Sequence, residues 1–137
     1  MIEYLLDANI VSEMPRNQPN PRVRAFMASV GSSSLFLSVL TIGELRKGVT
    51  RKQVKDPVGA RKYALFIDKL EATFVDRILD VDAEIAKVWG RLSENRSRPV
   101  VDTLLAATAI VHDLTLVTRN TADMSGLPVN LLNPWLF

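Results

Sequence analysis

The hydrophobic pattern of this 137-residue chain alternates short apolar runs with segments of helical spacing. The runs that predict buried strands are 2–6, 35–37, 74–79 and 114–118, with 129–132 as a last edge strand. Between them, apolar residues three or four positions apart predict helices around 23–30, 39–49, 63–70 and 85–92, and 10–14 is a candidate for one helical turn. Strands that alternate with helices predict an α/β fold with a mainly parallel central sheet flanked by helices, formed as a single domain over 1–137.

The polar interruptions of this pattern predict the breaks between elements. Asp56, Pro57 and Gly59 together predict a turn, and Asp82 is a candidate N-cap for the helix that follows it. The polar segment 95–99 is expected to be irregular.

The stretch from Pro99 to Met124 has the most distinctive pattern. Residues 103–111 are almost wholly apolar or small, which predicts a buried helix, and Asp102 is expected to be its N-cap. The strand that follows ends near Asn120 and Asp123. Because helix N-termini and strand C-termini share one edge of an open parallel sheet, we expect these three polar side chains to meet.

Two further acids are expected at the same edge. Asp7 follows the first strand directly, and Glu44 lies in the first turns of the helix after the second strand. Each acid has a purely structural alternative: Asp7 and Asp102 are plausible caps, Asp123 a loop residue, and Glu44 the last member of a capping box that begins at Thr41. Carboxylates gathered at one edge repel one another, however, and a divalent cation relieves that repulsion.

Composition narrows the choice of metal and of compartment. The chain has no cysteine and one histidine, so a metal must be held by oxygen, which favours Mg²⁺ or Mn²⁺. The absence of cysteine fits a reducing cytoplasm, and no apolar run or leader predicts a membrane span or secretion. No phosphate-binding glycine motif is present, and His112 falls at the far end of the buried helix from Asp102, so we interpret it as structural.

The charge is unevenly distributed although the net charge is only +2. Residues 44–62 carry seven bases against two acids. Such a segment is either a footprint for nucleic acid or simply the solvated surface of a helix.

Three motifs resemble the PIN-domain ribonucleases: Tyr4–Glu13, Leu37–Gly48 and Asp102–Ala109. The similarity covers essentially the whole chain and is greatest to the VapC-type toxins of the FitB-like branch, with which it shares an ending near Asn133-Pro134-Trp135. The resemblance implies a Mg²⁺- or Mn²⁺-dependent endoribonuclease that forms a homodimer and is neutralised by a small antitoxin. It would bind operator DNA only through that antitoxin.

Carried over by position, the resemblance assigns the acidic triad to Asp7, Glu44 and Asp102, and the fourth site position to Asn120, with Asp123 three residues further on. The sequence departs from the family pattern at Ala8, where Thr or Ser is usual, at Asn120, which is often Asp, and at Met124, where Phe is common.

We therefore expect RNA phosphodiester cleavage by metal-activated water. Asp7, Glu44, Asp102 and Asp123 are the expected metal ligands, and Asn120 is expected to assist. Arg46 and Arg119 are candidates for contact with the RNA backbone. The alternative is a weakly catalytic binding module that acts through an antitoxin and operator DNA. A homodimer also fits the apolar side chains Phe66, Ile67, Leu70 and Trp135-Leu136-Phe137.

Overall fold

The computed structural model describes residues 1–93 and 98–137, and its centre is a five-stranded parallel sheet. The strands are short: β1 (Tyr4–Leu6), β2 (Leu35–Ser38), β3 (Ile78–Leu79), β4 (Thr115–Val117) and β5 (Leu131–Leu132). They lie in the order β3-β2-β1-β4-β5, and every pair is parallel. This confirms the α/β prediction, including β5 as an edge strand.

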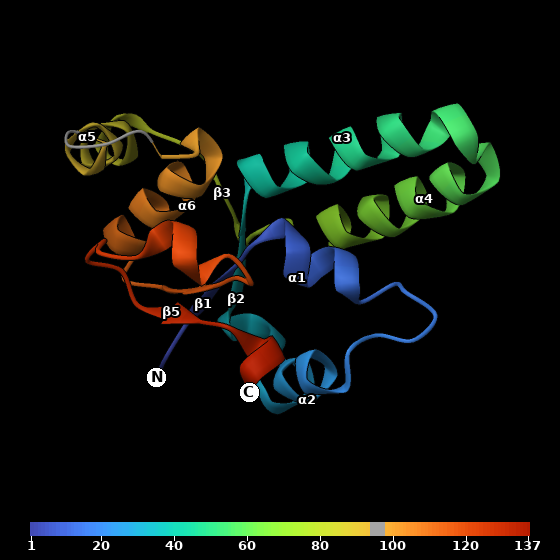
Figure 1. Cartoon of the computed structure of the whole chain (residues 1–137), viewed down its shortest axis with the longest axis horizontal. Coiled ribbons are helices and arrows are strands. Elements are labelled where there is room, and N and C mark those ends of the chain that lie inside the picture. The colour runs from blue at the N-terminus through green and yellow to red at the C-terminus, as the bar shows by residue number, and fades with distance from the viewer. Residues whose placement is uncertain (94–97) are drawn as a thin grey trace.

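Within the described residues, six α-helices surround the sheet: α1 (Ala8–Glu13), α2 (Pro21–Ser29), α3 (Val39–Lys55), α4 (Pro57–Thr73), α5 (Ala83–Leu92) and α6 (Val100–Val111). Figure 1 shows α3 and α4 as an antiparallel pair that extends away from the sheet, with α5 and α6 at the opposite end of the molecule. Three short 3₁₀ helices complete the fold: η1 (Ser32–Ser34), η2 (Thr121–Met124) and η3 (Pro134–Leu136). Within the described ranges, none of the helices is both long and apolar enough to cross a bilayer.

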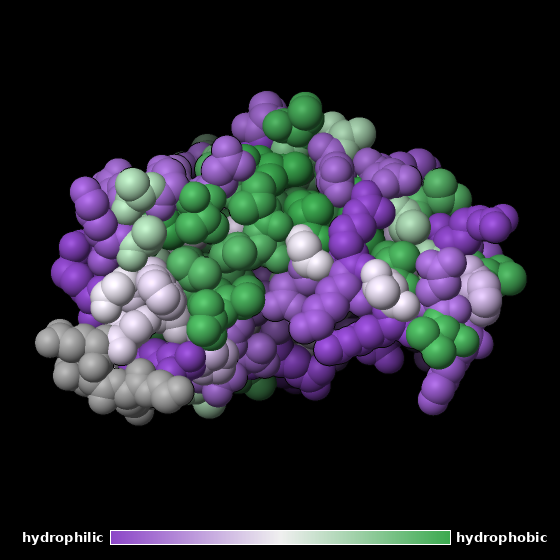
Figure 2. Space-filling view, turned by 90° about the horizontal axis from the view of Figure 1, so that it is seen from above, coloured by the Kyte–Doolittle hydropathy of each residue, from purple (hydrophilic) through white to green (hydrophobic). Residues whose placement is uncertain are grey.

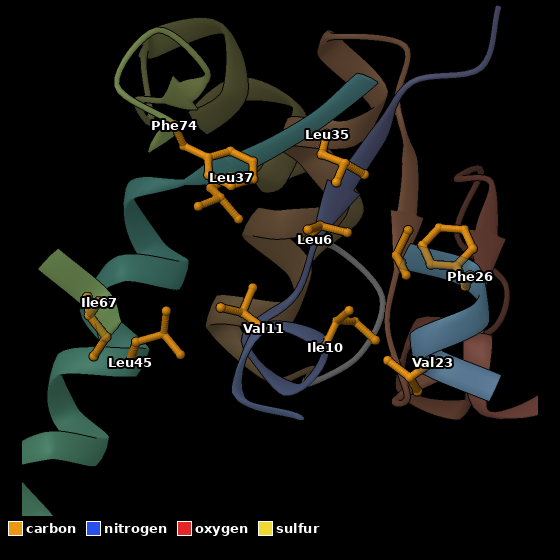
Figure 3. Close-up of a cluster of buried hydrophobic side chains, with 11 residues drawn as sticks. Leu6, Ile10, Val11, Val23, Phe26, Leu35, Leu37, Leu45, Ile67 and Phe74 are labelled. Carbon is orange, nitrogen blue, oxygen red and sulfur yellow. The ribbon is translucent and has the colours of Figure 1, made fainter. Parts of the chain in front are cut away.

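The sheet buries both of its faces because neighbouring strand residues point in opposite directions. Leu5 and Leu116 pack with α6, whereas Leu6 and Val117 pack with the first four helices. Figure 3 shows this second cluster, in which α1 inserts between α2 on one side and the α3–α4 pair on the other. Since α1 begins directly after β1, this packing fixes the carboxyl end of β1, where the candidate site lies.

The short third strand expected within 74–79 is confirmed as β3, which covers only the last two of these residues because α4 continues to Thr73 and the Phe74 N–H donates to the Leu70 carbonyl. One local prediction was wrong, because a helix begins earlier than the apolar spacing indicated. Gly59 lies inside the first turn of α4 rather than in a turn between helices. The Asp56 carboxylate accepts from the Gly59 N–H at 2.9 Å, and a Cβ at Gly59 would overlap that carboxylate. Most of the segment predicted to be irregular, 95–99, falls outside the described residues.

Candidate active site

The strand order creates a crevice between β1 and β4. The chain builds the sheet outward from β1 through β2 to β3, and then returns to the other side of β1 with β4 and β5. Ligands of open parallel sheets bind at such a reversal, outside the carboxyl ends of the strands. Asp7 follows β1 and Thr118 follows β4, so both side chains stand at this point.

Asp7 is the most tightly held carboxylate of the site, with only 6% of its surface exposed. Its Oδ2 accepts from the Thr118 hydroxyl at 2.8 Å and from the Asn9 amide at 3.3 Å, and its Oδ1 accepts from the Ala8 N–H at 2.7 Å. Asp7 is thus the N-cap of α1, so the structural role considered for it is confirmed. All of these donors are neutral, however, so they orient the carboxylate without cancelling its charge.

Burial is the main influence on Asp7 and raises its pKa. The hydrogen bonds from Thr118 and Ala8 oppose this effect, and the negative charge of Glu44 adds to it. The site therefore holds a carboxylate whose negative charge is costly in the absence of a cation.

Asp102 lies in the first turn of α6. The sequence pattern had predicted that Asp102 is the N-cap of this helix, and that prediction was wrong. The N-cap is Pro99, and its carbonyl accepts from the N–H and the hydroxyl of Thr103. Helix α6 begins three residues earlier than expected because Val100, Val101 and Asp102 already adopt helical conformation. The predicted buried helix itself is confirmed, since Thr103 and residues 105–109 are buried.

The surroundings of Asp102 raise its pKa to about 6. Partial burial is the largest cause, followed by repulsion from Asp7, Asp123 and Glu44 in that order. Asp7, Asp123 and Glu44 are therefore close enough to Asp102 to raise its pKa. The ion pairs of the described residues use other acids, namely Glu13, Asp56, Asp68, Glu71 and Asp76.

Glu44 does not belong to a capping box. The N-cap of α3 is Ser38, whose hydroxyl accepts from the Leu40 N–H at 3.0 Å. Thr41, the proposed first member of the box, is buried and donates its hydroxyl to the Leu6 carbonyl. The structural alternative for Glu44 is therefore wrong. The Glu44 side chain is exposed, and its negative charge contributes to the raised pKa of both Asp7 and Asp102.

Asn120 and Asp123 lie on the segment that follows β4. The Asn120 N–H donates to the Thr118 hydroxyl oxygen at 3.0 Å, and Asn120 precedes η2, which carries Asp123. Both side chains are exposed. The Arg98 guanidinium binds this segment through the Asp123 carbonyl at 3.1 Å and leaves the Asp123 carboxylate for the site.

The candidate ligands are four carboxylates and an amide, and their oxygen atoms suit a hard divalent cation. The hydrogen bonds that hold Asp7 at this edge come from neutral groups. As the side chains stand, no three acids or histidines among the described residues are close enough to hold one ion. Closing a ligand shell would require rotation of the exposed side chains Glu44 and Asp123 toward Asp7 and Asp102.

The candidate RNA-binding arginines are both engaged in contacts within the chain. The Arg46 guanidinium donates to Asp68 at 2.6 Å and to Glu71 at 3.0 Å, so two acids offset its charge. The Arg119 guanidinium lies over the Trp135 ring at 4.8 Å. The Arg119 backbone N–H donates to the Asn9 side-chain oxygen at 3.3 Å, and Asn9 in turn donates to Asp7, so the Arg119 backbone is linked to the site. His112 is exposed at the C-cap of α6, away from the site.

Sequence reasoning missed Thr118 and Asn9, the two side chains that orient Asp7. The rule that selected Asp7 could have selected Thr118, since it also directly follows a buried strand. At Ala8, which has no side-chain hydroxyl, the backbone N–H donates to Asp7, and the hydroxyl that binds this carboxylate comes from Thr118.

Comparison with known proteins agrees with this geometry. Residues 4–125 match the PIN domain family. The chain is 33% identical to the toxin FitB of Neisseria gonorrhoeae, covering 96% of this chain and 97% of FitB. It is 29% identical to the VapC ribonuclease Y4jK of Sinorhizobium fredii, covering 96% of each. A solved structure of FitAB bound to the IR36 DNA fragment superposes with a TM-score of 0.81 at 30% identity, over 96% of this chain and 95% of the other.

A parallel α/β sheet with acids converging at the β1/β4 crevice, together with this match, identifies the class: the chain belongs to the PIN domain family. Within that family, its similarity extends over the whole length of proteins named as a toxin and as a VapC ribonuclease.

Proposed function

We propose that this protein is a metal-dependent endoribonuclease and the toxin of a type II toxin–antitoxin module. The observation that carries the proposal is the group of four mutually repelling acids at the β1/β4 crevice, with Asp7 held there by neutral donors. A relative that aligns with 96% of the chain is named a ribonuclease, which supports RNA as the substrate.

Each residue has a distinct role in this proposal. Asp7 and Asp102 are the primary ligands for Mg²⁺ or Mn²⁺, Glu44 completes the shell, and Asn120 and Asp123 orient water or a second ion. When bound, the ion supplies a Lewis acid that activates water and stabilises charge on the phosphate. Thr118 and Asn9 keep the Asp7 carboxylate fixed for this task, and Arg119 contacts the RNA backbone.

The proposed partners follow from the same relatives. We propose a small cognate antitoxin, contact with operator DNA only through that antitoxin, and action in the cytoplasm. The solved FitAB complex on DNA supports an assembly of this kind.

We also propose a homodimer, with a contact surface that differs in part from the one first expected: Leu136 and Phe137 are exposed, but the expected side chains of α4 are largely used by the monomer core. Ile67 is fully buried within the monomer, and Phe66 and Leu70 pack against the same core. Figure 2 shows apolar side chains gathered on the face seen from above, between the α5–α6 end and the α3–α4 end. Val39 and Val100, the first residues of α3 and α6, are 38% and 58% exposed.

The test is cleavage of single-stranded RNA with Mn²⁺, with Mg²⁺ and with EDTA, by the parent and by Asp7→Asn. The expected result is cleavage that requires metal and is lost in the variant. Metal-independent cleavage, or full activity of Asp7→Asn, would contradict the proposed site. RNA that stays intact with every metal, while the antitoxin still binds, would favour the alternative of a binding module.

A further inference from the structure

A second hollow lies at the far end of α1 from the carboxylates. Its volume is about 630 Å³, and its wall includes Ser12 of α1, Arg16 of the following loop, Lys52 of α3, and Lys62, Tyr63 and Phe66 of α4. This size is within the range of pockets that hold small organic ligands. Phe66 also packs against the hydrophobic core, and none of these residues has a role in the carboxylate site.

The chemistry of this pocket combines flat aromatic surface with positive charge. The Tyr63 and Phe66 rings are nearly parallel, with an interplanar angle of 4° and centroids 6.2 Å apart. Arg16, Lys52 and Lys62 are exposed, and Lys52 pairs at 3.6 Å with Asp56, the acid in the lining. Since Arg16 also pairs with an acid, Lys62 is the base of the pocket whose charge no ion pair offsets among the described residues. Aromatic rings beside cations are the means by which proteins hold unpaired bases and the phosphates that join them.

The pocket wall is held in place by buried or closely packed groups. Glu13 at the end of α1 is buried and accepts from the Asn20 N–H at 2.8 Å and from Arg16 at 3.2 Å, which ties down the loop that carries Arg16. The Tyr63 ring lies against Gly48 of α3, where a Cβ would stand 3.4 Å from it. The aromatic surface is therefore already formed in the free protein.

Two helices connect the pocket to the carboxylates. Helix α1 begins next to Asp7 and reaches Ser12 about 6 Å further along its axis, at 1.5 Å per residue. Along α3, Lys52 stands about 12 Å beyond Glu44 on the same scale. At about 3.4 Å per stacked nucleotide, this interval corresponds to about two to four nucleotides.

We propose that this pocket is a nucleotide subsite for the RNA substrate, in which one unpaired base stacks on Tyr63 while Lys62 and its neighbours bind the adjoining phosphates. The inference rests on the proposed ribonuclease function and adds to it that the substrate is single-stranded about two to four nucleotides from the cleaved bond. Because every base has an aromatic face, stacking of this kind selects an unpaired base rather than a particular sequence.

The first experiment measures binding of a single-stranded RNA of about 12 nucleotides, a length within the usual site sizes. Fluorescence anisotropy is recorded in EDTA, so that the RNA stays intact, over a range of salt. Lys62→Gln is compared with Lys69→Gln, which makes the same change of charge on an exposed position of α4 outside the pocket. We expect Lys62→Gln to weaken binding and to reduce the salt slope by about 0.7, and Lys69→Gln to leave that slope unchanged.

The second experiment detects the stacked base directly. 2-Aminopurine is placed at successive positions of the RNA, and its fluorescence is expected to be quenched at one position by the parent and by Tyr63→Phe, which keeps the ring. Tyr63→Leu should lose the quenching and weaken binding by about 5- to 100-fold. Melting curves of each variant identify any that fail to fold, and the exposed Lys62→Gln keeps the test valid if Tyr63→Leu is among them.

Several outcomes separate the possibilities. Equal RNA binding and equal salt slopes for Lys62→Gln and Lys69→Gln would overturn the subsite, as would quenching that survives Tyr63→Leu. Unchanged RNA binding together with weakened antitoxin binding would show that the pocket holds a protein segment instead. If the parent binds and stacks RNA but does not cleave it with any metal, the proposed function fails while the subsite stands.

Discussion

The Thr118 hydroxyl donates a 2.8 Å hydrogen bond to Asp7 Oδ2 and so joins the ends of two neighbouring strands that are 111 residues apart in the chain. The same oxygen atom of Thr118 accepts from the Asn120 N–H. One buried hydroxyl thus fixes both the first carboxylate of the site and the start of the segment that carries Asp123.

Replacing this hydroxyl tests its importance. Thr118→Val keeps the shape but removes a donor to a carboxylate, a bond that contributes about 1.5–3 kcal/mol. Because that bond lowers the pKa of Asp7, its loss should raise this pKa and move the acid limb of the RNA-cleavage profile to higher pH. Urea unfolding and a pH–rate profile would measure the two effects.

Thr108→Val is the matched control for this substitution. Thr108 is also buried, but it donates to the Leu104 carbonyl within α6. The control should lose some stability and leave the pH profile of cleavage unchanged. A profile that is identical for Thr118→Val and the parent would show that Thr118 has no influence on Asp7.

The stability of the metal-free protein should depend on pH through Asp102. Its folded pKa of about 6 lies above the ordinary value of 3.8 for an aspartate, so the folded state binds the proton more tightly than the unfolded state. The resulting stabilisation is complete below about pH 4 and is lost as the pH rises through about 6. Urea unfolding in EDTA at several pH values should show this decline, and Asp102→Asn should reduce it.

Metal should reverse this behaviour, because a cation favours the ionised carboxylates. Saturating Mn²⁺ at 100 times its dissociation constant would stabilise the folded state by about 2.7 kcal/mol. We expect the rise in melting temperature to be small at pH 5 and to grow as the pH passes 6. A melting temperature that does not respond to Mn²⁺ at any pH would contradict the metal site.

Asp102→Asn separates the charge of Asp102 from its place in the helix. Removing this charge relieves repulsion by Asp7, Asp123 and Glu44 but loses a favourable charge at a helix N-terminus, worth about 0.3–1 kcal/mol. In EDTA at neutral pH the variant should be at least as stable as the parent. It should gain little from Mn²⁺, and its RNA cleavage should fall by orders of magnitude.

Glu84→Gln, in the first turn of α5, is the control for Asp102→Asn. It removes a first-turn charge from a helix outside the acidic group, so it should lose a little stability and keep both the Mn²⁺ response and cleavage. Parent-like cleavage by Asp102→Asn would place the active site elsewhere.

The homodimer proposal is tested by sedimentation at micromolar concentration. A double variant in which the exposed residues Val39 and Val100 are each changed to Gln should shift toward monomer, because the apolar surface that these residues contribute would no longer favour association. Val54→Gln, a change at a more exposed valine near the other end of α3, should leave the dimer intact. A monomeric parent protein would refute the dimer.

Periodicity and strand position were sufficient to predict the fold and the edge at which the acids meet. The buried helix 103–111 was recognisable because it lacks a polar face, and Asp7 because it directly follows an apolar run. Helix ends were harder to predict: the cap of α6 is a proline carbonyl, and α4 begins at a proline that the sequence pattern had placed in a turn.

Two relationships depended on tertiary structure and could not be derived from local sequence. The bond between Thr118 and Asp7 requires knowledge that β4 lies beside β1. The engagement of Arg46 by Asp68 and Glu71 depends on how α3 packs against α4. Composition alone had left open whether the basic residues of 44–62 bind nucleic acid. Because Arg46 pairs with two acids, it is removed from the candidates for that contact.

The strand order also determines when, during synthesis, the protein becomes able to act. A ribosome that has made the first hundred or so residues has already produced Asp7, Glu44 and Asp102, but β4 and Thr118 come later. A contact between residues 111 positions apart is expected to form late in folding, because closing so long a loop costs conformational entropy. The nascent chain therefore carries these three acids without the strand that organises them. A chain truncated after His112 should therefore show no Mn²⁺-dependent stabilisation, which means that a toxic nuclease would be harmless to its own ribosome until nearly complete.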